Sequence, residues 1–136
     1  MKIKDRLSHI RAGMEDAMER GATAGDRFIY ESSIAEIRRV GRWLKEQCST
    51  ECRLYTETDG DSQRQYIEFR NTTGMDFRFF AMEVIVLREE REVDSFEVMT
   101  AGWRNGETAR LYLARNIGSE DVLSFNPDSV EYQVMR

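Results

Sequence analysis

The chain has 136 residues, of which 40% are hydrophobic and 10% aromatic, and its formal net charge is −5. This length fits one domain that buries roughly 70% of the surface of its unfolded chain, and the aromatic content excludes a disordered chain. The acidic balance excludes direct binding to a nucleic-acid backbone, which requires a basic surface. No stretch approaches the roughly 20 apolar residues that cross a bilayer, so we expect no membrane contact.

In the first 48 residues, apolar side chains recur every three or four positions, which predicts amphipathic helices. The first stripe consists of Ile3, Leu7, Ile10 and Met14. Its helix should end near Gly21. The second helix should begin at a capping box formed by Ser33 and Glu36 and continue to Cys48.

After Cys48 the apolar residues alternate with polar ones, which predicts strands. Segments 52–58 and 63–69 should form a hairpin, with Gly60-Asp61 as a two-residue type II′ turn. The pairs expected from this turn are Cys52–Phe69, Leu54–Ile67, Arg53–Glu68, Tyr55–Tyr66 and Glu57–Arg64. Two opposite-charge pairs and one aromatic pair favour this register.

The segment from Phe77 to Leu87 is the most apolar of the chain and has apolar residues at both alternating sets of positions. A strand of this kind is covered on both faces, so we expect it at the centre of the sheet. The charged stretch 88–94 predicts a solvated connection.

The dipeptide Asn105-Gly106 predicts a second hairpin. Its expected pairs are Val98–Leu113, Thr100–Leu111, Met99–Tyr112, Ala101–Arg110 and Trp103–Thr108. The tail should contain a short segment 122–125, a turn at 126–128 and a last strand over 130–134. The predicted architecture is α+β in a single domain: two N-terminal helices (1–48) packed on one face of an antiparallel sheet of about five to six strands (49–136).

Residues suited to metal or cofactor chemistry are scarce. His9 is the only histidine, which excludes metal sites built on several histidines. The chain has no phosphate-binding loop, so we expect no cofactor and no metal. Cys48 and Cys52 are too few for a disulfide framework and are expected to be small apolar core residues, which indicates a reduced, cytoplasmic protein.

Strand carboxylates are the candidates for acid–base catalysis if the protein is an enzyme. Glu68 and Glu83 would then act with Tyr55 or Tyr66. The predicted register gives Glu68 an arginine partner, whereas Glu83 lies on the apolar central strand with no partner nearby in sequence. A structural ion pair explains the first of these carboxylates without catalysis.

The predicted sheet has more apolar surface than two helices can cover, which indicates a binding surface. The candidate ligand-binding or partner-binding residues are Arg78, Met99, Trp103, Arg110 and Tyr112. The first hypothesis is a non-enzymatic protein-binding module, an inhibitor or adaptor, that self-associates through its sheet and engages another protein. The alternatives are binding of an anionic or nucleotide-like small ligand by arginines and aromatic rings, and a small oligomeric enzyme.

Overall fold

The structure is a computed structural model that describes residues 1–48, 52–115 and 117–135, except for the side chains of Gln47 and Cys48. Two helices, α1 (Ile3–Glu19) and α2 (Ala24–Trp43), come first, and a short π-helical segment, η1 (Leu44–Cys48), extends α2. The strands are β1 (Cys52–Asp59), β2 (Ser62–Arg70), β3 (Phe77–Arg88), β4 (Arg91–Trp103), β5 (Thr108–Leu113) and β6 (Val122–Val134). The predicted α+β class is confirmed. The expected core role of Cys48 concerns a side chain outside the described residues.

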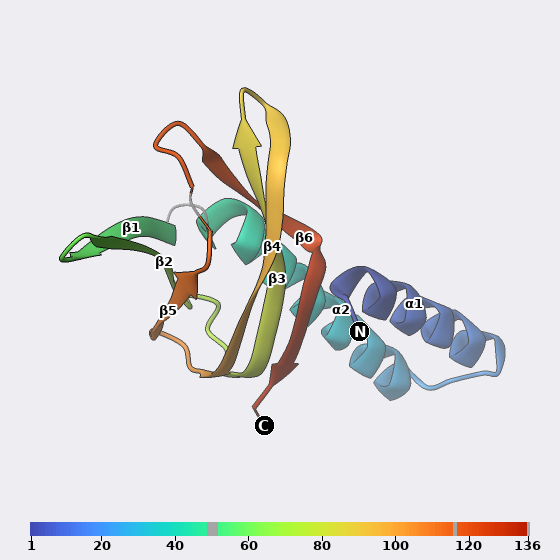
Figure 1. Cartoon of the computed structure of the whole chain (residues 1–136). Coiled ribbons are helices and arrows are strands. Elements are labelled where there is room, and N and C mark those ends of the chain that lie inside the picture. Colours follow the sequence, from blue (N-terminus) through green and yellow to red (C-terminus); the bar gives the residue numbers. More distant parts are fainter. Residues whose placement is uncertain (49–51, 116, 136) are drawn as a thin grey trace.

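The strands form two antiparallel sheets instead of the one sheet predicted. The strand order is β1-β2-β5 in the smaller sheet and β4-β3-β6 in the larger sheet, whose strands are longer. Both helices pack on β6. Figure 1 shows the helices at one end of the molecule and the β1–β2 hairpin at the opposite end.

The first helix agrees with the prediction, but the second begins nine residues before the predicted cap. Its capping box consists of Thr23 and Asp26: the Thr23 hydroxyl accepts from the Asp26 N–H, and the Asp26 carboxylate accepts from the Thr23 N–H. Ser33 lies inside the helix and donates its hydroxyl hydrogen to the carbonyl of Ile29. The sequence contains two capping boxes, and the helix begins at the earlier one, where both members of the box are bonded.

The first hairpin has the predicted register throughout. Tyr55 pairs with Tyr66, and Asp59 and Ser62 close the ladder around Gly60-Asp61. Gly60 has a φ of +61°, whereas Asp61 does not have a positive φ, as a type II′ turn requires. A local turn and complementary cross-strand pairs were sufficient to determine this hairpin.

The second predicted hairpin is wrong, although its turn lies where expected. β4 pairs with β3 and β5 pairs with β2, in different sheets. The turn bonds to the loop between β2 and β3 instead: Asn105 Oδ1 accepts from the Gly74 N–H at 2.8 Å, and Asp76 accepts from the Asn105 N–H at 2.8 Å. The N–H of Gly106 also donates to the carbonyl of Asn71 at 2.7 Å. These bonds direct β5 away from β4.

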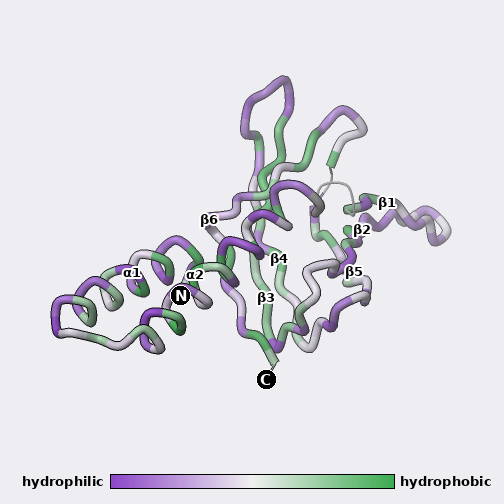
Figure 2. The backbone as a smooth tube through the Cα atoms, turned by 180° about the vertical axis from the view of Figure 1, so that it is seen from behind, coloured by the Kyte–Doolittle hydropathy of each residue, from purple (hydrophilic) through white to green (hydrophobic). Residues whose placement is uncertain are grey.

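The stretch 88–94 is exposed and connects two strands, as its charges predict, but most of it is itself strand. It is the tip of a long β3–β4 hairpin, and Glu89 and Glu90 form the turn with φ values of 52° and 65°. Figure 2 shows that this tip is hydrophilic, whereas much of β3 and β4 is hydrophobic. Pairing of the flanking strands therefore overrides the low strand propensity of a charged segment.

The C-terminal segments form one strand, β6, with an interruption where a turn was predicted. The register against β3 shifts between Ala81 and Glu83. At this point the Ser129 hydroxyl accepts from the Glu83 N–H at 2.8 Å and donates to the carbonyl of Asn126 at 2.7 Å. Pro127, which cannot donate to a ladder, lies in this irregular stretch, as is usual for proline within a sheet.

β3 is the central strand of the larger sheet, as predicted, but only one of its faces is fully buried. The buried side chains are those of Phe80, Met82, Val84 and Val86. Phe79, Ile85 and Leu87 on the opposite face are half-buried. The prediction that both faces are covered is therefore only partly correct.

Trp103 lies at the centre of an aromatic core and is 3% exposed. Its ring centroid is 5.9 Å from that of Trp43 in α2, 5.2 Å from that of Phe69 in β2 and 5.3 Å from that of Phe80 in β3. Its Nε1–H donates to the carbonyl of Glu107 at 2.9 Å, so the buried donor is satisfied. One side chain thus joins the second helix to both sheets.

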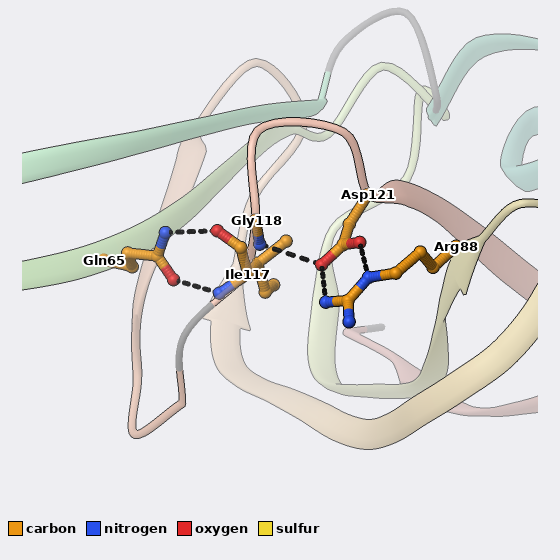
Figure 3. Close-up of polar contacts among 5 residues, drawn as sticks. All are labelled: Gln65, Arg88, Ile117, Gly118 and Asp121. Carbon is orange, nitrogen blue, oxygen red and sulfur yellow. Dashed lines mark hydrogen bonds and ion pairs between the residues drawn. The ribbon is translucent and has the colours of Figure 1, made fainter.

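The segment between β5 and β6 is attached to both sheets by side chains (Figure 3). The Gln65 amide in β2 donates to the Ile117 carbonyl at 2.8 Å and accepts from the Ile117 N–H at 2.6 Å. Asp121 accepts two hydrogen bonds from Arg88 at the end of β3, at 2.8 and 3.1 Å, and one from the Gly118 N–H at 2.8 Å. The Arg88 guanidinium and the Gly118 N–H both stabilise the carboxylate, so the pKa of Asp121 lies below its ordinary value.

We expect Trp103→Ala to lower the free energy of unfolding by about 3–5 kcal/mol, because truncation of a buried tryptophan leaves a cavity between three elements. Met99→Ala is the matched control: Met99 is 53% exposed, so the expected change is within about 0.5 kcal/mol. Urea denaturation measures both values. A loss below about 1 kcal/mol for Trp103→Ala would contradict a central role for this side chain.

We expect Asp121→Asn to destabilise the fold at neutral pH. A carboxyl with a lowered pKa in the folded state stabilises the protein above its unfolded pKa of about 4, and this stabilisation is lost as the pH falls through the folded pKa. The difference between wild type and variant, measured by urea denaturation at a series of pH values, should therefore shrink below about pH 4. A difference that is constant with pH would show that the ion pair with Arg88 contributes nothing.

Candidate functional site

The structure distributes the predicted site residues over four places. Arg110 and Tyr112, and also the proposed acid–base residues Tyr55, Tyr66 and Glu68, lie on the outer face of the smaller sheet. Met99 and Glu83 lie on the outer face of the larger sheet, Trp103 lies in the core, and Arg78 lies beside the N-terminus of α1. Five of the nine candidates therefore share one surface.

Strand alternation produces this surface. In β2 the side chains of Ile67 and Phe69 are fully buried, so Tyr66 and Glu68 point away from the core. The ladders place Tyr66 between Tyr55 in β1 and Tyr112 in β5. We call this surface the tyrosine face, which consists of Tyr55, Tyr66, Tyr112, Arg53, Arg64, Arg110, Glu57 and Glu68.

The three tyrosines of the tyrosine face form a row across the sheet. The ring centroids of Tyr55 and Tyr66 are 5.5 Å apart with the ring planes at 18°, and those of Tyr66 and Tyr112 are 5.8 Å apart at 60°. The guanidinium carbon of Arg110 lies 4.3 Å from the Tyr66 ring centroid and 5.2 Å from that of Tyr55. Ring stacking and cation–π contacts thus hold the row in place, while Tyr112 remains 60% exposed.

The charged side chains of the tyrosine face lie beside opposite charges, and two of them form an ion pair. Arg110 forms an ion pair with Glu57, and Glu68 lies between Arg53 and Arg110 in the ladders. Pairing of β5 with β2 brings Arg110 to this position, and sequence analysis missed that pairing because it assigned β5 to β4. The signal that could have revealed it is the similar alternation of β2 and β5, where Glu68 and Tyr66 match Arg110 and Tyr112.

Two groups of the smaller sheet have raised pKa values. Burial among neighbouring side chains, together with a hydrogen bond to the Glu68 carboxylate, raises the pKa of Tyr55 above its ordinary value of 10.0. Burial likewise raises the pKa of the Cys52 thiol to about 11, which leaves it protonated and unreactive.

Met99 and Tyr112 meet at a cleft between the two sheets. The cleft has a volume of about 260 Å³, and its walls come from β4 and β5, where the predicted hairpin would have been. Such a volume is below the roughly 300 Å³ of typical small-molecule sites. On the outer face of the larger sheet, Glu83 lies directly opposite Glu97, an unfavourable pair of like charges.

Trp103 and Arg78 do not join these surfaces. The burial of Trp103 removes it from any surface that a ligand or partner could reach, because the aromatic core forms around it. Arg78 is exposed and lines a shallow depression with Arg6, His9 and Glu36, at the contact of α1 with β6. Of the five predicted binding residues, only Arg110 and Tyr112 lie on the tyrosine face.

A groove between α1 and α2 was not anticipated from the sequence. It has a volume of about 790 Å³, and Met14, Ile34 and Ala35 contribute apolar lining. Its basic side chains are those of Arg11, Arg38, Arg39 and Arg42. The ion pairs found among the described residues include none of these four arginines.

Among the described residues, no group of three or more histidine, cysteine, aspartate or glutamate side chains could hold a metal ion. Within the same part of the chain, no helix is long and apolar enough to cross a membrane. Comparisons with protein-family models, curated proteins and solved structures give no match. The function is therefore inferred from the surfaces themselves.

Proposed function

We propose that this protein is a non-enzymatic protein-binding module, of the inhibitor or adaptor kind, that self-associates through its smaller sheet and engages another protein through the tyrosine face. The observation that carries the proposal is the row of Tyr55, Tyr66 and Tyr112 with Arg110 over it. Tyrosine and arginine are enriched at the centres of protein interfaces. A reducing compartment such as the cytoplasm suits this proposal, with Cys52 as a free thiol.

The state of the row favours a protein partner over a stacked nucleotide. Tyr55 and Tyr66 stack on each other, and Arg110 covers Tyr66. Their ring faces and the guanidinium group are therefore occupied, whereas base recognition requires free ring faces. Preordered rings lose little conformational entropy when a protein surface packs on them.

Self-association is tested by sedimentation velocity over a range from low to high micromolar concentration. We expect a concentration-dependent shift from monomer to dimer, and at least a tenfold weaker dimer for Tyr55→Ala, with circular dichroism as a check of the fold. Met99→Ala on the larger sheet is the matched control and should leave dimerisation unchanged. A wild-type protein that stays monomeric, or equal losses in both variants, would contradict the proposal.

The groove between the helices supports a second candidate function, binding of a phosphate-bearing ligand. Four arginines without ion pairs among the described residues line it and outnumber its two carboxylates, Glu15 and Glu31. Guanidinium groups match phosphate oxygens in geometry and charge. Residues 1–48 contain ten Lys and Arg against eight Asp and Glu, whereas residues 49–136 contain ten against 17. The helical part therefore has a net charge of +2 in a chain whose total is −5.

Inorganic tripolyphosphate is the probe for this groove, at a constant ionic strength set with chloride. We expect it to raise the melting temperature, by an amount that corresponds to about 2.7 kcal/mol at 100 times the dissociation constant. Arg38→Gln combined with Arg42→Gln should abolish the shift, whereas Arg64→Gln on the tyrosine face should retain it. A flat response of the wild type, or an equal response of all variants, would exclude the groove as a phosphate site.

A further inference from the structure

Four strands lie at the edges of the two sheets, and they differ in what covers them. The edge of β6 contacts α1, α2 and η1. Arg115 lies along β4, where it donates to the Ser95 carbonyl at 3.0 Å and pairs with Asp94, and the short β5 lies next to β4. In the described part of the chain, β1 has a ladder only with β2, so its other edge has no strand beside it.

The free edge of β1 has three charged side chains, Arg53, Glu57 and Asp59, but lacks the other features that prevent edge pairing. β1 has eight residues and contains neither proline nor lysine, and its ladder with β2 is regular from Cys52 to Asp59. Natural proteins usually protect such an edge by a bulge, a proline, an inward-pointing charge or a covering segment. A regular uncovered strand is a template for addition of another strand.

The turn determines which backbone groups point to the free edge. The two-residue turn makes Asp59 and Ser62 a hydrogen-bonded pair, and bonded and non-bonded pairs alternate along an antiparallel ladder. The N–H and C=O groups of Arg53, Tyr55 and Glu57 therefore point toward β2. Those of Cys52, Leu54, Thr56 and Thr58 point toward the free edge.

We infer that β1 pairs with β1 of a second copy of this chain, antiparallel and centred on Tyr55. This inference rests on the proposed self-association and specifies its geometry. Around a twofold axis at Tyr55, Leu54 faces Thr56 of the second copy and Cys52 faces its Thr58, so the outward-pointing groups meet one another. Four such residue pairs exchange about eight backbone hydrogen bonds.

Opposite-charge pairs and a tyrosine pair together favour this register. On the tyrosine face, Arg53 of each copy faces Glu57 of the other, and the two Tyr55 rings face each other. The same kinds of pair occur between β1 and β2 of one chain, as Arg53–Glu68, Tyr55–Tyr66 and Glu57–Arg64. A centre on Thr56 would place each Tyr55 opposite Glu57 of the other copy, and a centre on Leu54 would place each Arg53 opposite Tyr55. The Thr56 centre keeps an opposite-charge pair, Arg53 with Asp59 of the other copy, but only the Tyr55 centre combines the Arg53–Glu57 pairs with a tyrosine pair.

The dimer joins the two smaller sheets into one sheet with the order β5-β2-β1-β1-β2-β5. Its tyrosine faces merge into a single row of tyrosines that crosses the twofold axis. Pairing therefore satisfies the free edge of β1 and doubles the surface available to a partner protein. The isologous geometry closes the assembly at two copies, because the described residues of each copy offer one such edge.

Disulfide trapping tests the register in a background with Cys48→Ser and Cys52→Ser. Tyr55→Cys should form a disulfide-linked dimer under mild oxidation, because residues opposite in a non-hydrogen-bonded pair have Cα atoms about 4.5 Å apart. Thr56→Cys is the matched control and should not, because the two copies of residue 56 are more than about 7 Å apart in this register. Trapping at residue 56 but not at residue 55 would overturn the Tyr55-centred pairing.

Thr56→Pro gives an independent measurement. Proline removes an N–H that points to the free edge and leaves the ladder with β2 intact, so the monomer should still fold. The dissociation constant of the dimer should increase at least tenfold. Thr56→Val should dimerise like the wild type. If the wild type is dimeric and Thr56→Pro has no effect, the edge pairing is wrong and self-association stands. If the wild type is monomeric, self-association fails and the pairing fails with it.

Discussion

The packing of Trp103 between the second helix and the two sheets is the constraint on which the rest of the structure depends. The residue lies at the end of β4, immediately before the turn at Asn105-Gly106, and its ring contacts Trp43, Phe69 and Phe80. Because Asn105 and Gly106 bond to the loop 71–76, the chain leaves β4 and joins β2. That change of partner divides one potential sheet into two. The same change forms the tyrosine face, because the pairing of β5 with β2 places Tyr112 opposite Tyr66.

Local signals were sufficient for part of the fold. The first hairpin follows from a glycine at the first position of its turn and from complementary pairs such as Arg53–Glu68. The position of β3 at the centre of its sheet follows from its apolar run. The second hairpin could not be predicted in this way, since the groups that redirect it, Asn71, Gly74 and Asp76, are about 30 residues away in sequence.

The candidate site was predictable only in its parts. Tyr55, Tyr66, Glu68, Arg110 and Tyr112 were each identified from the sequence, but under two separate hypotheses, for catalysis and for ligand binding. The structure places them on one face. Trp103 was misassigned because an aromatic residue beside a turn has the same local pattern in a binding surface and in a core. The arginine groove was not predicted because its four arginines come from two helices. The sequence alone does not determine which faces of these helices meet.

The core residue Trp103 and the turn beside it direct β5 to β2. The smaller sheet that results exposes its tyrosine face, and the free edge of β1 lies at the end of that face. Amide hydrogen exchange at residue resolution, at a low and a high protein concentration, tests the central claim most directly. The account predicts that the amides of Leu54, Thr56 and Thr58 become protected at high concentration, while the amides of Tyr55 and Glu57, already bonded to β2, change little. Dimerisation without added protection at these three amides would contradict it.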